Sequence, residues 1–420
     1  MTTSLSKAVD AAADRVAKWW PALLVFILVL NIFKGVRMPN RWSVTHYLFT
    51  YDFGFIKRAL WGETLWRVFG SWTASYFFLA AIALAIFVTL SILVVRSALR
   101  IASRHNHIPI ALVLCASPAI AMFAHLVGYL EQLGYVVLLF VAFSRRSFVL
   151  RAALMTMAAA ILPFVHEASI FWFGPLTMLA IVAGRRRSAE DAASRTDTRL
   201  ATALLIGVVW LISTGIVVRL GEHTTAVQAH ALRDAKTQFF SIRPRQDAFN
   251  TVAIPYWHAR ADMKRRWRDP ATRLDLATSL LTFGPGAIFL TVAAFRGAQR
   301  ISDKTVRRTA FALLGPAIFT RMLLHLIAWD LHRWNAIAAL NAGIAAMLLN
   351  LPGRNADEPR ATGGLSMGVA LAVAFWSLAA DPVFFDAYAP AHPPFFWHIQ
   401  FLMEFFRTWN WDMWIPVVGN

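Results

Sequence analysis

The sequence predicts an all-α, polytopic integral membrane protein with about eleven transmembrane helices. First, 58% of its 420 residues are hydrophobic and only 15% are charged, whereas soluble domains average about 25% charged residues. Second, apolar runs close to the ~20 residues that cross a bilayer recur along the chain. Third, the basic residues behind a net charge of +18 gather between alternate runs. This combination nearly excludes a water-soluble enzyme.

The predicted spans follow the apolar runs in chain order. The third contains Pro118 and the fourth is short, and spans of both kinds often break, tilt or re-enter the membrane. Because no internal repeat or flexible linker divides the chain, we expect residues 1–420 to form a single membrane domain. The spans are 19–36, 74–95, 108–126, 131–143, 149–165, 168–184, 200–218, 276–295, 309–328, 335–351 and 364–380.

The orientation follows from the positive-inside rule. Of the 41 Lys and Arg residues, 21 fall in segments that these spans place on one side of the membrane, which predicts a cytoplasmic N-terminus. Residues 1–18 alternate apolar and charged side chains and are expected to form an amphipathic helix on the cytoplasmic surface. The long segments 37–73 and 219–275 and the tail 381–420 would then lie outside, with interfacial helices in the loops.

Polar residues near the outer span ends are the candidates for function, because ionisable groups at membrane depth are seldom retained without a role. The cytoplasmic arginines are sufficiently explained by topology. On the outer side, acids and histidines stand among aromatic residues, which predicts a polar cavity at the outer face. These residues are Asp52, Glu63, Glu131, Glu167, Asp330, Asp381, His125, His166, His325 and His332.

The first outer segment contains the run YDFGFIKRALWGE, with Asp52 shortly before the adjacent cations Lys57 and Arg58. A carboxylate held at the interface can act as a general base while neighbouring cations bind phosphate. The alternative is an interfacial helix with a capping aspartate and snorkelling basic side chains.

The turn between the fifth and sixth spans holds His166 beside Glu167. An adjacent histidine and glutamate can form an acid–base pair, and the alternative is a helix cap with a solvated histidine. A metal site needs three or four ligands, and no HxxxH or DxD spacing completes one here. We therefore predict no metal site and no cofactor; a divalent metal ion has no support in the sequence.

Arg321 lies inside the apolar run of the ninth span, where burying a charge costs at least about 2.5 kcal/mol on insertion scales. Such a charge is usually kept for an anion, and we predict a ligand phosphate. His325 shares its helix face. The alternative is an ion pair with Asp330 or Glu131 that only holds helices together. Glu131 itself would line the cavity or pair with Arg321.

The long loop 219–275 contains a basic aromatic stretch at 256–269. This pattern is typical of an interfacial helix that contacts anionic lipid headgroups or a lipid-linked phosphate, so membrane lipids are expected partners. Nucleic acid is not expected on the outer face, and no nucleotide-binding fingerprint occurs. The tryptophans of the tail favour the membrane interface and can also stack on sugar rings.

The run FGFIKRALWGETL resembles the FGFxKRGLxG pattern of polytopic proteins from bacterial envelope-polysaccharide gene sets. Other features of that group also have counterparts here, although Ala59 replaces the usual glycine. The matching features are Ser117-Pro118, Glu131, His166-Glu167 and the Asp330, Arg333 and Trp334 of an Asp-x-x-Arg-Trp motif.

The architecture is also similar to the glycosyltransferase-C class and to repeat-unit polymerases. The resemblance implies glycan transfer from a polyprenyl-(pyro)phosphate-linked saccharide at the outer face of a bacterial inner membrane, with other envelope-polysaccharide synthesis proteins as partners. Asp52 matches the catalytic base by position, and His166 with Glu167 is the alternative base. The expected donor phosphate ligands are Arg321, Arg333, Lys57 and Arg58, and the expected cavity-lining residues are Glu131, His325 and Asp330.

Two other classes stay open. A transporter or flippase for a lipid-linked saccharide or another anionic substrate would also use an interior arginine and a proline-broken span. However, a proton-coupled transporter should have carboxylates near mid-membrane, whereas here they cluster at the outer ends. A structural subunit of a synthase complex would instead make Asp52 and Arg321 important for assembly.

Overall fold

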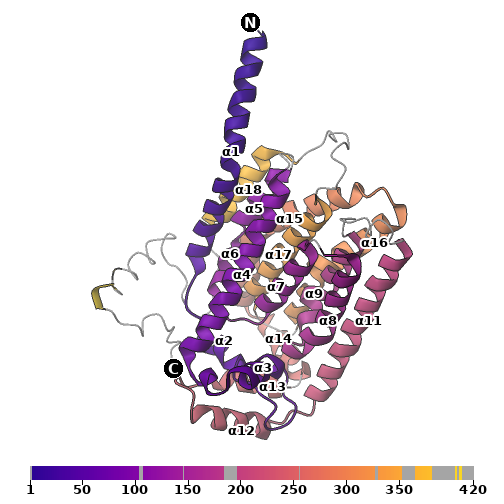
Figure 1. Ribbon diagram of the computed structural model, residues 1–420. Coiled ribbons are helices and arrows are strands. Elements are labelled where there is room, and N and C mark those ends of the chain that lie inside the picture. The colour runs from indigo at the N-terminus through magenta and orange to yellow at the C-terminus, as the bar shows by residue number, and fades with distance from the viewer. Residues whose placement is uncertain are drawn as a thin grey trace.

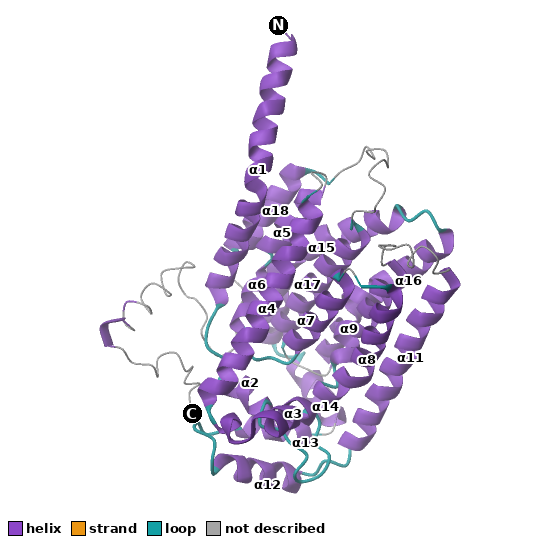
Figure 2. Ribbon diagram, viewed as in Figure 1, coloured by secondary structure: helices purple, strands orange, loops and turns teal. Residues whose placement is uncertain are grey.

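The computed structural model describes most of the chain as helices joined by short turns (Figure 2). It describes residues 2–103, 107–144, 146–183, 196–254, 256–326, 330–351, 365–380, 403 and 406–408. Nearly all of the tail predicted at 381–420 lies outside these residues. Within them, all regular secondary structure is helical, so the prediction of an all-α protein is confirmed.

Most of the helices stand side by side in one bundle, and the others gather at one end of it (Figure 1). The bundle helices are α1 (Thr2–Gly35), α4 (Tyr76–Ala102), α5 (Ile108–Ala116), α6 (Pro118–His125), α7 (Glu131–Phe143), α8 (Phe148–Val165), α9 (Ser169–Ala183), α11 (Thr196–Gly221), α15 (Pro270–Gln299), α16 (Lys304–Phe319) with η3 (Thr320–Leu326), α17 (Leu331–Leu349) and α18 (Met367–Ala379). The end helices are α2 (Arg41–His46), α3 (Ala59–Phe69), η1 (Gly70–Ala74), α12 (Ala226–Thr237), α13 (Gln246–Ala253) and α14 (Tyr256–Arg266). We call this the capped end.

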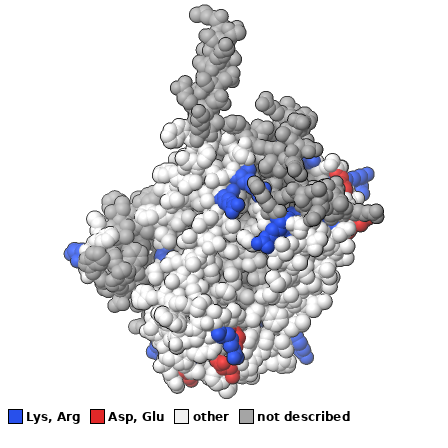
Figure 3. Space-filling view, viewed as in Figure 1, with Lys and Arg blue, Asp and Glu red and all other residues white. Residues whose placement is uncertain are grey.

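The membrane character of the chain is visible in its helices. In the described part, six helical segments are long and apolar enough to cross a membrane, and four shorter apolar helices accompany them. Each of the eleven predicted runs is at least partly helical, while the number of spans and their orientation remain predictions. Uncharged residues form the broad middle of the face in Figure 3, and charges of both signs appear at its lower, capped end.

The third predicted span is the enclosed centre of the bundle, because all of Ile108–His125 is buried. It breaks between α5 and α6 at Ser117, as the following Pro118 predicted. Asn31 of α1 satisfies carbonyl groups that the break exposes, donating to the oxygens of Cys115 at 3.2 Å and Ser117 at 2.6 Å. The break is therefore a stable feature whose backbone groups have partners.

The beginning of the chain differs from the prediction. A separate amphipathic helix was expected at 1–18, followed by a span, but α1 runs without interruption from Thr2 to Gly35 and projects from the bundle (Figure 1). The physical reason is that the alanine-rich segment favours helix and only Pro21 interrupts the hydrogen-bonding pattern.

The two long loops predicted outside the membrane fold together at the capped end. Side chains of the first loop pack with α12 and α13 of the second in a small hydrophobic core that includes Phe49, Ile56, Leu232 and Phe249. Gly62 of α3 permits a close approach, since a Cβ there would lie 2.3 Å from the carbonyl oxygen of Phe49. This cap covers the ends of the bundle helices that carry most of the predicted site.

Candidate functional site

Arg333 forms the most completely paired charge of the capped end. It lies in the first turn of α17, where its Nε and Nη2 donate to the two carboxylate oxygens of Glu131 at 2.8 and 2.9 Å. Its Nη1 donates to Asp330 at 3.0 Å. Both Arg333 and Glu131 are buried, so a planar, bidentate pair joins the start of α17 to the start of α7.

Arg58 makes a second bidentate pair. Its Nε and Nη2 donate to Glu167, with distances of 2.9 Å from Nε to Oε2 and 2.6 Å from Nη2 to Oε1. Arg58 precedes α3 with a φ of 68°, the left-handed region, and no other non-glycine residue in the described part has a positive φ. Such backbone strain is retained only where surrounding contacts impose it, and it often occurs at functional sites.

The two arginines belong to one closed ring of side chains, drawn from segments far apart in the sequence. Aromatic rings separate them on both sides, and Trp334 also stacks on Arg333 at 4.7 Å. With distances to ring centroids for the aromatic contacts and between atoms for the others, the contacts in order are Arg58–Glu167, Glu167–His166 at 3.6 Å, His166–Trp172 at 4.5 Å, Trp172–Arg333 at 5.8 Å, Arg333–Tyr129 at 4.6 Å, Tyr129–Trp42 at 5.2 Å, Trp42–His46 at 4.1 Å and His46–Arg58 at 3.5 Å. We call this ring, with Glu131, Asp330 and Trp334, the two-arginine cluster.

Both histidines of the cluster are neutral. Burial and the nearby Arg58 lower the pKa of His46 to about 3 and hold the pKa of His166 well below its ordinary value. Nδ1 of His166 accepts a hydrogen bond from the Ala168 amide at 3.2 Å, and Nδ1 of His46 donates to the Trp42 carbonyl at 2.9 Å. His46 therefore presents its Nε2 lone pair to Arg58.

The charges of the cluster balance. Lys57 is buried next to Arg58, which is 15% exposed, and it interacts electrostatically with Glu167, so three cations face three carboxylates. Burial works to raise the pKa of Glu167, but the charge and hydrogen bonds of Arg58 outweigh it and hold that pKa below its ordinary range. Burial raises the pKa of Asp330 despite Arg333. An anion entering this cluster must displace a carboxylate or bring a proton with it.

Asp52, the predicted base, lies on the cap, in the loop that leads to Arg58. Its carboxylate is bonded to residues outside the two-arginine cluster. Its carboxylate accepts from the Thr50 hydroxyl at 2.6 Å and from Nζ of Lys236, on α12, at 3.2 Å. These bonds, the Thr50 bond first, lower the pKa of Asp52. Its side chain is 42% exposed, so it is the predicted site residue most open to an acceptor.

Arg321 lies apart from these pairs. Its guanidinium donates to the carbonyl oxygen of Ile337 at 2.9 Å and to that of Ala317. No carboxylate among the described residues makes an ion pair with it. Arg333 takes both acids, Asp330 and Glu131, that were the expected alternatives for Arg321. These contacts indicate that Arg321 holds α16 and α17 together, and they do not favour phosphate binding.

His325 also faces inward, away from the ring contacts. Its Nε2 lies 3.3 Å from Oδ1 of Asn335, and Nδ2 of Asn335 donates to the hydroxyl of Ser279 on α15 at 2.7 Å. The structure thus brings together Arg58, His166, Glu167, Glu131, Asp330 and Arg333, with Lys57 beside them. Asp52 lies on the cap, and Arg321 and His325 lie in the helix packing.

Sequence reasoning missed four members of the cluster: Trp42, His46, Tyr129 and Trp172. A signal existed for the first two, because residues four apart on a helix share a face, and that face of α2 points to the bundle. Tyr129 and Trp172 give no such signal, since aromatic residues near span ends are common.

Among the residues that the structure describes, no group of three or more His, Cys, Asp or Glu side chains is placed to hold a metal ion. Comparison with protein-family models, with curated proteins and with solved structures finds no match, so the site is interpreted from its own geometry.

Proposed function

We propose that the protein is a membrane glycosyltransferase or polysaccharide repeat-unit polymerase that takes a saccharide from a polyprenyl-(pyro)phosphate carrier. The observation that supports this most is the two-arginine cluster. Its guanidinium groups have the fork geometry that suits phosphate as well as carboxylate oxygens. Its aromatic rings, from Trp42, Tyr129, Trp172 and Trp334, are of the kind on which sugar rings pack. Because Tyr129, Trp172 and Trp334 are buried, a sugar would reach them only when an entering phosphate opens the cluster.

In the proposed reaction, an acceptor hydroxyl oxygen attacks the anomeric carbon of the donor sugar. The bond from that carbon to the carrier phosphate oxygen breaks, its electron pair leaves with the phosphate, and the hydroxyl proton passes to a base. Arg58, Arg333 and Lys57 stabilise the negative charge that develops on the leaving phosphate.

Two carboxylates are candidates for the base. Asp52 is ionised and half-exposed, so it can accept a proton without rearrangement. Glu167 is held by Arg58, and it becomes a base only when the donor phosphate takes its place on the guanidinium. In that second route, phosphate binding itself releases the base, with His166 beside it.

The test uses purified protein in liposomes with a radiolabelled polyprenyl-pyrophosphate saccharide extracted from the host, and measures labelled glycan transferred to acceptor. Asp52→Asn and Glu167→Gln should each be compared with Asp247→Asn, a control that neutralises a cap carboxylate whose exposure (48%) is close to that of Asp52 (42%). We expect one of the first two variants to lose at least a hundredfold in rate while the control retains wild-type transfer. Wild-type rates in both would contradict the base assignment.

Transport is the second candidate, and the enclosed broken span supports it. Discontinuous helices at the centre of a bundle often line substrate sites in transporters, and α5 and α6 form such a pair. The same liposomes distinguish the two functions. Movement of the labelled lipid between leaflets without any glycan transfer would favour the flippase.

A further inference from the structure

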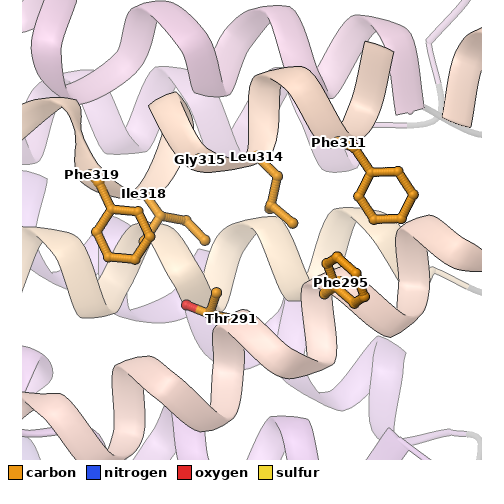
Figure 4. A pocket seen from close by; sticks show the side chains of 7 residues that line it. All are labelled: Thr291, Phe295, Phe311, Leu314, Gly315, Ile318 and Phe319. Atoms are coloured by element: carbon orange, nitrogen blue, oxygen red, sulfur yellow. The ribbon is translucent and has the colours of Figure 1, made fainter. Parts of the chain in front are cut away.

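A groove with a volume of about 410 Å³ lies between α15 and α16, helices that contribute no residue to the two-arginine cluster. Figure 4 shows the side chains of the two helices that face it. Phe295 and Phe319 are among the exposed large hydrophobic residues of the bundle, so the groove opens on its outer surface. Its apolar lining residues are Phe295, Phe311, Leu314, Gly315, Ile318 and Phe319.

The walls of the groove offer nothing to a polar ligand. Its one hydroxyl, on Thr291, donates to the Ala287 carbonyl within α15 at 2.7 Å. The rings of Phe295 and Phe311 meet at one end, with centroids 4.9 Å apart. Gly315 keeps the groove open, because a Cβ built there meets no atom within 4 Å.

A basic patch stands beyond that phenylalanine pair. The end of α15 and the beginning of α16 carry Arg296, Arg300, Lys304, Arg307 and Arg308. Arg307 and Arg308 precede Phe311 by about one helical turn, so the charged and apolar stretches lie on one side of α16.

The turn between α15 and α16 also carries a carboxylate, Asp303, which already accepts several hydrogen bonds. Asp303 caps α16 by accepting from the amides of Thr305 and Val306 at 2.9 and 3.0 Å, and it also accepts from the hydroxyl of Thr196. The five basic side chains outnumber this carboxylate, so the mouth of the groove carries an excess of positive charge.

We propose that this groove binds an acyl chain of an anionic glycerophospholipid whose headgroup phosphate is held by the basic patch. An apolar groove open to hydrocarbon is filled by lipid, and the charge at its mouth selects which lipid. Basic residues between transmembrane helices near the membrane surface are a known means of recognising anionic headgroups. The apolar groove would hold the acyl chain, and the basic side chains at its end would hold the phosphate. This proposal does not depend on the proposed sugar transfer.

The experiment measures lipid retained by the purified full-length protein, using native mass spectrometry after exchange into phosphatidylglycerol or phosphatidylcholine of identical acyl chains. We expect at least fivefold more phosphatidylglycerol than phosphatidylcholine on the wild type. Arg307→Gln with Arg308→Gln should remove this preference, whereas Arg265→Gln, an exposed arginine of α14, should leave it unchanged. Equal retention of both lipids by the wild type would overturn the proposal.

A second pair of variants tests the groove itself. Gly315→Leu fills it and should reduce retained phosphatidylglycerol at least fivefold. Gly284→Leu is the matched control, since a Cβ at that glycine of α15 also meets no atom within 4 Å and the residue lies outside the groove lining. A shared thermal unfolding midpoint establishes that all variants fold. Unchanged retention by Gly315→Leu, or displacement of phosphatidylglycerol by polyprenyl phosphate, would contradict the assignment.

Discussion

Two buried arginines, twelve residues apart in the sequence, have opposite kinds of partner. Arg333 is 3% exposed and is surrounded by two carboxylates and three aromatic rings. Arg321 is 0% exposed and donates to backbone carbonyl oxygens. Both residues are arginines near the end of a predicted span, and they look alike in the sequence. The difference shows that burial of a charge does not by itself mark a ligand site.

The helix termini explain the contrast. Arg321 follows the C-terminal end of α16, where unpaired carbonyl groups and the helix dipole stabilise a cation. Arg333 lies in the first turn of α17, where the dipole disfavours a cation and Asp330 and Glu131 compensate. A carboxylate can be exchanged for a phosphate, whereas a backbone carbonyl cannot, so Arg333 is the better candidate for anion binding.

The largest expected effect is at Arg333. Arg333→Gln leaves the buried Glu131 without its cation, and breaking a buried pair in this way costs about 3–5 kcal/mol of stability. The free energy of unfolding in mixed detergent micelles measures the loss. The double variant Glu131→Gln with Arg333→Gln should recover part of it, because no charge is left alone. A single variant as stable as the wild type would remove the distinction between the two arginines.

Arg321→Met should be less damaging. The substitution leaves no carboxylate without its cation, and only the carbonyl groups of Ala317 and Ile337 lose a donor. We therefore expect the free energy of unfolding to fall by about 1–3 kcal/mol. Transfer of the labelled saccharide per folded molecule should stay at the wild-type level. If transfer falls at least tenfold while the fold persists, Arg321 takes part in phosphate binding after all.

Acid should destabilise the cluster through its neutral histidines. The folded-state pKa of His46 is about 3, whereas an unfolded histidine titrates near about 6.5. Between these values the unfolded state binds more protons, so stability falls as the pH falls below about 6.5. We expect a loss of about 1–2 kcal/mol from this group between pH 7 and pH 5. Unfolding measured at both pH values checks this.

A matched pair of variants isolates that pH dependence. His46→Gln keeps a polar side chain that cannot charge, so the slope of stability against pH should become shallower. His223→Gln, at an exposed position of the cap, should keep the wild-type slope. Equal slopes for all three proteins would show that His46 is not the group responsible.

The smallest effect on stability is expected at the cap. Asp52 is 42% exposed, although its partner Lys236 is only 4% exposed. Because Lys236 keeps its contacts with the rings of Trp66 and Phe239 when the carboxylate is removed, we expect the loss to stay near the ~0–1 kcal/mol of solvent-accessible pairs. Because its pKa is lowered, this contribution is present at neutral pH and disappears only as the pH falls below about 4. Asp52→Asn should therefore unfold within about 1 kcal/mol of the wild type. A larger loss would mean that any activity defect has a structural cause.

Much of the fold followed from local sequence properties. Apolar runs of bilayer length predicted where helices lie, and Pro118 predicted the break in the central span, because length, hydrophobicity and the missing proline N–H act within a segment. The continuous α1 and the change from α16 to η3 at Thr320 were not predicted. The packing of the cap depends on contacts between residues about 180 positions apart, such as Lys236 with Asp52.

For the site, the sequence placed acids and histidines at the predicted outer span ends, and six of the ten predicted residues meet in the two-arginine cluster. Composition and spacing alone determined the class of the protein and the neighbourhood of its polar residues. Only the tertiary structure decided that Glu131 pairs with Arg333 and Glu167 with Arg58. The reason is that hydrophobic burial is set residue by residue along the chain, whereas an ion pair requires two distant helix ends to be aligned within hydrogen-bonding distance.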